Sequence, residues 1–158
     1  MTYAALKTVH LLAIIVWVGG MVFAQFFLRP AVATLEPPLR LRLMHQVLGR
    51  FFGAVLAASL LALLSGLGML GHAARQAAVS GGTSALPWPW TVMAVLGTLM
   101  VAIFLHIRFV LYKRLTRALG AGDAPAGGAA LGRIRQWVGV NLALGTLIVV
   151  VTLLGRPL

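Results

Sequence analysis

Four long apolar runs constrain the fold of this chain more than any other feature. They cover about residues 4–28, 51–72, 90–112 and 137–155, and each approaches the ~20 residues with which an α-helix crosses the hydrocarbon core of a bilayer. Hydrophobic residues make up 61% of the chain and charged residues 9%, whereas soluble domains carry about 25% charged residues. We therefore predict an integral membrane protein, an all-α four-helix transmembrane bundle that forms one membrane domain over residues 1–158.

The basic residues predict the orientation of this bundle, because cytoplasmic connections are enriched in lysine and arginine. The net charge is +11, and most of it lies on or beside the first and third connections, at Arg29, Arg40, Arg42, Arg50, Arg108, Lys113, Arg114, Arg117, Arg133 and Arg135. Only Lys7, Arg75 and Arg156 fall at the other end. We expect a multi-pass protein of the bacterial inner membrane with both termini in the periplasm. The basic residues form no patch interleaved with aromatic residues, so we expect lipid headgroups rather than nucleic acid as their partners.

The connections contain residues that interrupt helices. Pro30, Pro37 and Pro38 predict a break after the first run, and the Gly- and Ala-rich residues 120–128 predict a flexible connection. Residues 39–50 alternate leucine or methionine with arginine and histidine. This segment is either an amphipathic helix on the membrane surface or a continuation of the second helix.

Four histidines fall in or beside the apolar runs, where an ionisable side chain is costly and indicates a functional site. His10 lies about 8–9 Å below one surface by helical rise, and His72 ends the second run on the same side. His45 and His106 lie toward the opposite side. Because a b-type haem is held between two axial ligands from facing helices, the sequence favours an outer pair, His10 with His72, and an inner pair, His106 with His45. Interfacial solvation or packing is the alternative role for each histidine.

The leading functional prediction is therefore a membrane protein that binds one or two haem b groups. It would transfer electrons or act as a haem-dependent oxidoreductase, with a redox protein or a quinone as partner. Several other residues are candidate members of the same sites: Met69 as an alternative axial ligand, Lys7 and Arg75 as contacts for haem propionates, and Asn141 as a hydrogen-bond partner that orients His106. Three further methionines, Met21, Met93 and Met100, also lie inside the runs.

The absence of some residue types narrows the chemistry. The chain has no cysteine, which excludes disulfides, iron–sulfur clusters and thiolate zinc sites. The apolar runs contain no carboxylate, which argues against a carboxylate-driven proton pump. The alternative function is copper handling by His10, His72 and Met69, since imidazole and thioether ligands suit Cu(I). A further alternative is a structural subunit of a respiratory complex, or a homo-oligomer, in which the histidines only pack.

Short motifs along nearly the whole chain resemble a known family. They are Lys7-x-x-His10 followed by Trp17-x-x-Gly20, Arg50-Phe51-Phe52 ending in Ser65-Gly66-Leu67-Gly68-Met69, His106 before a basic exit, and the segment Arg133 to Asn141. This pattern is similar to the copper-resistance CopD-like membrane proteins and the related HemJ-type bacterial membrane protoporphyrinogen oxidases. The resemblance implies a helical bundle, haem b in the oxidase branch, copper handling in the CopD branch, and His10 with Trp17 in the site.

Two positions depart from the oxidase pattern. The third run begins Trp88-Pro89-Trp90-Thr91-Val92-Met93 without the expected lysine, and Leu142 follows Asn141 where an acidic residue is expected. The resemblance therefore favours the CopD branch over a protoporphyrinogen oxidase.

Overall fold

The structure, a computed structural model, describes residues 2–79 and 88–155, and every regular element within these ranges is helical. The elements are α1 (Thr2–Val22), the π-helix η1 (Phe23–Leu28), α2 (Arg29–Val32), α3 (Pro37–Val79), α4 (Trp88–His106), the π-helix η2 (Ile107–Leu111), α5 (Tyr112–Gly120) and α6 (Ala124–Leu154). Consecutive elements join into four rods, Thr2–Val32, Pro37–Val79, Trp88–Gly120 and Ala124–Leu154, each long and apolar enough to cross a membrane. The predicted all-α transmembrane bundle is confirmed, whereas its orientation stays a prediction.

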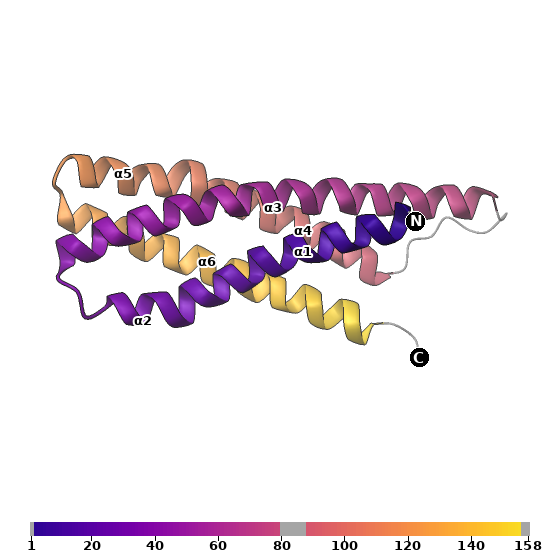
Figure 1. Cartoon of the computed structure of the whole chain (residues 1–158), viewed down its shortest axis with the longest axis horizontal. Coiled ribbons are helices and arrows are strands. Elements are labelled where there is room, and N and C mark those ends of the chain that lie inside the picture. Colours follow the sequence, from indigo (N-terminus) through magenta and orange to yellow (C-terminus); the bar gives the residue numbers. More distant parts are fainter. Residues whose placement is uncertain (1, 80–87, 156–158) are drawn as a thin grey trace.

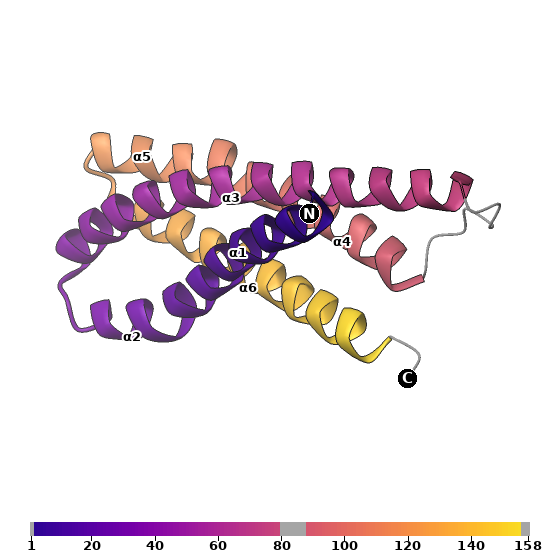
Figure 2. The ribbon, with the colours of Figure 1, turned by 45° about the vertical axis from the view of Figure 1, so that its right-hand side comes forward.

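The rods lie side by side along one long axis (Figure 1). The α1 helix packs mainly against α3, while α6 packs against both α4 and α5. The turns that join α2 to α3 and α5 to α6 lie together at one end, which we call the basic end, and the N-terminus lies toward the other (Figure 1). The C-terminal part of α6 diverges from α3 in both views (Figure 2).

The helices extend past the predicted spans at the basic end. Because α3 begins at Pro37, residues 39–50 are a continuation of the second helix, which decides between the two alternatives that the sequence left open. The predicted flexible connection over 120–128 is wrong, since α6 already begins at Ala124. Asp123 Oδ1 accepts a hydrogen bond from Ala126 N at 2.9 Å, and a side-chain acceptor at this position starts a helix. The turn itself needs only Gly122, whose φ is +68°.

The predicted break at Pro30 is also wrong, because the first rod continues to Val32. Proline lacks an N–H, and its ring meets the carbonyl four residues earlier in an α-helix. The wider π-helical turn η1 ends directly before this point, and Arg29 N–H bonds to Ala24 O, five residues back. Pro30 therefore falls in the first turn of α2, where an N–H is not required.

The tightest packing lies in the half of the bundle nearer the basic end. Its fully buried side chains are Met44, Leu48, Phe52, Val55, Ile107, Leu115 and Ile134. Toward the middle of the bundle, Trp17 meets Phe104 edge to face with ring centroids 5.9 Å apart. Large apolar side chains such as Leu12, Ile15 and Leu64 are exposed on the outside, as expected for a surface that contacts lipid.

Candidate functional site

His10 is anchored on the neighbouring helix by one of its two ring nitrogens. Its Nδ1 lies 2.9 Å from the carbonyl oxygen of Ala62 and 3.1 Å from Ser65 Oγ on α3. A carbonyl oxygen only accepts hydrogen bonds, so Nδ1 carries the proton and donates it. The neutral imidazole then keeps its lone pair on Nε2, which is the form that binds metal ions.

The same histidine lines an apolar cavity of about 210 Å³ between α1, α3, α4 and α6. Of the described residues on its walls, His10 is the only titratable one. Two thioethers, those of Met93 and Met100, line the cavity from α4, and Trp17 lines it from α1. The cavity therefore combines one imidazole and two thioether sulfurs with walls that are otherwise almost entirely apolar.

Glycines bring the helices close around this cavity. A Cβ on Gly66 would lie 3.5 Å from His10 Cε1, and one on Gly145 would lie 3.2 Å from Met100 Cε. The absence of these side chains lets the ring of His10 lie against α3 and the thioether of Met100 lie against α6. Glycine in this position is typical of close packing between membrane helices.

The predicted outer pair, His10 with His72, does not meet at this cavity. His72 packs against the ring of Tyr3, with centroids 5.6 Å apart, and Tyr3 precedes His10 by seven residues, which is about 10 Å of helical rise. Met69 is buried, yet it does not line the cavity. Lys7 and Arg75 are exposed.

The predicted inner pair is also divided between two environments. The ring of His45 stacks on Tyr112 with centroids 4.9 Å apart, and its Nε2 lies 2.9 Å from Thr116 Oγ1. That hydroxyl donates its own proton to Tyr112 O, so it accepts from His45. His106 is exposed and contacts the Trp137 ring at 5.7 Å.

Asn141, predicted to orient His106, is instead 1% exposed in the interior. Its Oδ1 is buried and has no hydrogen-bond partner among the described residues. The structure therefore shows no bond from Asn141 Oδ1 to His106, whose ring lies against Trp137. The role of Asn141 toward a cofactor stays a prediction.

The donor set decides which cofactor the cavity suits. Within residues 2–79 and 88–155, no three His, Cys, Asp or Glu side chains form a metal-binding group. The cavity does not fit a haem b with two histidine ligands, because it offers one histidine and about 210 Å³, whereas ligand pockets usually measure about 300–1,000 Å³. One imidazole with nearby thioethers suits a single soft cation such as Cu(I).

The fold and this cavity define a multi-pass helical membrane protein with an apolar internal cavity. The family model of copper resistance protein D (CopD) matches residues 45–154, which is more than half of the chain. The chain therefore belongs to the CopD family. The match covers α3 to α6, which supply three walls of the cavity, while α1 with His10 precedes it. Comparisons with curated proteins and with solved structures gave no match.

The sequence singled out Met69, whereas the structure places Met93 and Met100 on the cavity. A pattern in the sequence does distinguish these two methionines. Met93, Gly97 and Met100 follow one another at i, i+4 and i+7, so they share one face of a helix. Gly97 on this face also lines the cavity, and a Cβ there would meet nothing within 4 Å.

Proposed function

We propose that this protein handles Cu(I) within the membrane, with His10 Nε2 as its principal ligand. The observation that carries the proposal is the hydrogen bond from His10 Nδ1 to Ala62 O, since it leaves Nε2 as the metal-binding nitrogen of a histidine that lines an apolar cavity. The name of the family, copper resistance protein D, supports copper as the metal. In this role copper is the cargo of the protein, and no redox step is required.

The ligand chemistry of the cavity favours the monovalent ion. A cation that enters an apolar cavity loses its hydration shell, and protein ligands must replace the water molecules. Cu(I) prefers the soft donors imidazole and thioether, which His10, Met93 and Met100 provide from α1 and α4. The walls provide no carboxylate, the ligand type that suits hard divalent ions.

Competition for Cu(I) with a chromophoric chelator tests this proposal. The detergent-purified protein is titrated under reducing conditions, and the affinity of the wild type is compared with that of His10→Ala. We expect His10→Ala to raise the Kd at least about tenfold, which corresponds to about 1.4 kcal/mol of lost binding free energy. His72→Ala is the matched control, because His72 is also half-buried but packs on Tyr3, and we expect it to bind as the wild type does.

The methionines provide a second measurement. Met93→Leu combined with Met100→Leu keeps the volume of the side chains but removes both sulfurs, so we expect weaker Cu(I) binding with unchanged thermal unfolding. Unchanged affinity in His10→Ala, or equal losses in His10→Ala and His72→Ala, would overturn the proposal.

The haem b prediction is tested with the same preparation. If the purified protein shows a Soret band and His10→Ala does not, the ligand of this site is haem and the copper proposal is wrong. Copper binding without a porphyrin spectrum is the result that we expect.

A further inference from the structure

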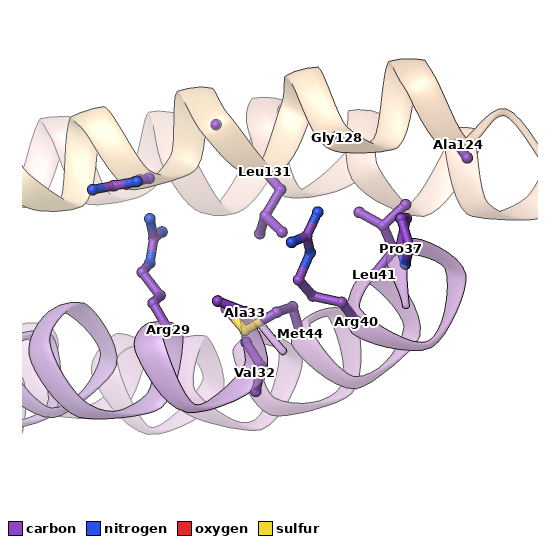
Figure 3. A pocket seen from close by; sticks show the side chains of 12 residues that line it. Arg29, Val32, Ala33, Pro37, Arg40, Leu41, Met44, Ala124, Gly128 and Leu131 are labelled. Carbon is purple, nitrogen blue, oxygen red and sulfur yellow. The ribbon is translucent and has the colours of Figure 1, made fainter. Parts of the chain in front are cut away.

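A second cavity lies at the basic end, between α2, α3 and α6, and measures about 310 Å³. Three arginines line it: Arg29 from α2, Arg40 from α3 and Arg135 from α6. Arg29 and Arg40 extend from their helices toward the facing helix α6 (Figure 3). We call this cavity the arginine pocket.

The described residues that line the arginine pocket are the three arginines and apolar residues. None of the described residues that line it is a glutamate or an aspartate. The two acidic residues of the chain, Glu36 and Asp123, directly precede the lining residues Pro37 and Ala124, but neither of them lines the pocket. Like charges this close repel one another unless a counter-charge is present, so the pocket attracts an anion.

The side chain of Arg29 is partly buried at this pocket. Its Nε is buried and has no hydrogen-bond partner among the described residues. A buried donor without an acceptor costs free energy, and the cost is greater for a charged group. A counter-anion bound beside the guanidinium group would offset part of this cost.

The donor geometry of the arginines and the depth of the pocket relative to the membrane favour a phosphate-bearing anion. Arginine presents several N–H donors in a planar fork that matches phosphate oxygens. Arg29 directly follows the first apolar run and Arg135 lies two residues before the last, which places both at the level of the lipid headgroups. Val32, Leu41 and Met44 add apolar walls beside the guanidinium groups, as the junction between a headgroup and its acyl chains requires.

We infer that the arginine pocket is a binding site for a phosphate-bearing anion, either the headgroup of an anionic phospholipid or free phosphate. Binding would hold the first rod and α6 together at the basic end. It involves none of the residues of the His10 cavity, so its test does not depend on copper.

Native mass spectrometry of the purified protein tests whether an anionic phospholipid binds in the arginine pocket. The protein is exchanged into detergent with added phosphatidylglycerol or phosphatidylcholine, and the fraction that carries one phospholipid is measured. We expect a phosphatidylglycerol adduct in the wild type and a loss of about tenfold in its affinity in the triple variant R29Q/R40Q/R135Q. The control variant R42Q/R114Q/R133Q loses the same charge from exposed arginines outside the pocket and should keep the adduct.

Thermal unfolding with added inorganic phosphate tests whether free phosphate is the ligand of the arginine pocket. A phosphate-dependent rise in Tm that is lost only in the pocket variant would assign free phosphate as the ligand. The variant R29K/R40K/R135K keeps the charge but loses the planar fork, so it should fold and bind more weakly than the wild type. The inference is overturned if both readouts are the same in the pocket and control variants.

Discussion

At the scale of single residues, the hydrogen bonds of His10 and His45 separate a candidate ligand from a structural side chain. His10 Nδ1 donates a hydrogen bond to the carbonyl oxygen of Ala62, and the residue lines an apolar cavity. His45 instead donates from Nε2 to Thr116 and lies flat on Tyr112. An imidazole bound in this way ties α3 to α5. The contrast between these two histidines is the reason why we propose His10, and not His45, as a copper ligand.

Gly20 and Gly19 form a matched pair for a prediction about close packing. A Cβ on Gly20 would overlap the ring of Phe51, whereas one on Gly19 would meet nothing within 4 Å. Because overpacking forces neighbouring atoms to move, we expect Gly20→Ala to lower the free energy of unfolding by about 1–3 kcal/mol. Gly19→Ala should leave it unchanged or raise it slightly. Unfolding of both variants in mixed detergent micelles measures the difference, and equal stabilities would contradict the packing argument.

The sequence could identify His10 as a candidate because its depth in an apolar run follows from residue count alone. The pairing of histidines could not be obtained in this way. Helical rise gives the level of a residue, but the facing partner depends on the rotation of each helix, which only packing determines. His106 and Asn141 were predicted to act together, yet one is exposed beside Trp137 and the other is fully buried.

At the scale of helices, a π-helical turn and a helix cap at the basic end keep helical the segments in which proline and glycine predicted a break and a flexible loop. Proline and glycine stop helices on average, but η1 accommodates Pro30, and an aspartate cap starts α6 before Gly127 and Gly128. The four spans were predictable because each needs only a long apolar run. Their continuation past the membrane was not, because it depends on single hydrogen bonds and on packing against neighbouring helices.

Asp123 provides a prediction about the start of α6. Its carboxylate accepts from Ala126 N at 2.9 Å, and loss of such a cap usually costs about 1 kcal/mol of stability. We expect Asp123→Ala to lower the free energy of unfolding by about that amount, while Asp123→Asn, which keeps an acceptor oxygen, should retain most of it. Detergent-based unfolding of the three proteins measures the effect. An equal loss in both variants would mean that charge, rather than the hydrogen bond, stabilises the helix start.

At the scale of the whole molecule, one half of the bundle combines a closely packed interior with the arginine pocket at its end, and the other half contains the His10 cavity. Phe52, Ile107, Leu115 and Ile134 fill the space between helices toward the basic end. Farther along, glycines and small residues leave the His10 cavity between α1, α3, α4 and α6. The packed half holds the rods in register, so the other half can keep a cavity without losing the arrangement of the helices.

The distribution of charge predicts how the molecule lies in the membrane. Most of its lysines and arginines lie on or beside the two connections of the basic end, and such an excess favours the cytoplasmic side. Because the wild type has no cysteine, single cysteines can report each end without background. We expect Ala78→Cys, near the end of α3, to react with a membrane-impermeant maleimide in intact cells. Ala121→Cys, in the turn before α6, should react only after the inner membrane is opened.

Both positions are exposed in the structure, so burial within the protein does not hinder their labelling. Labelling of Ala121→Cys but not of Ala78→Cys in intact cells would invert the predicted topology. The inverted topology would place the arginine pocket at the outer surface. The excess of basic residues in cytoplasmic connections would then not explain the charge of the pocket. The predicted result places the pocket next to the inner leaflet, whose anionic lipids attract basic segments, and it places the N-terminal end of α1, which carries His10, toward the periplasm.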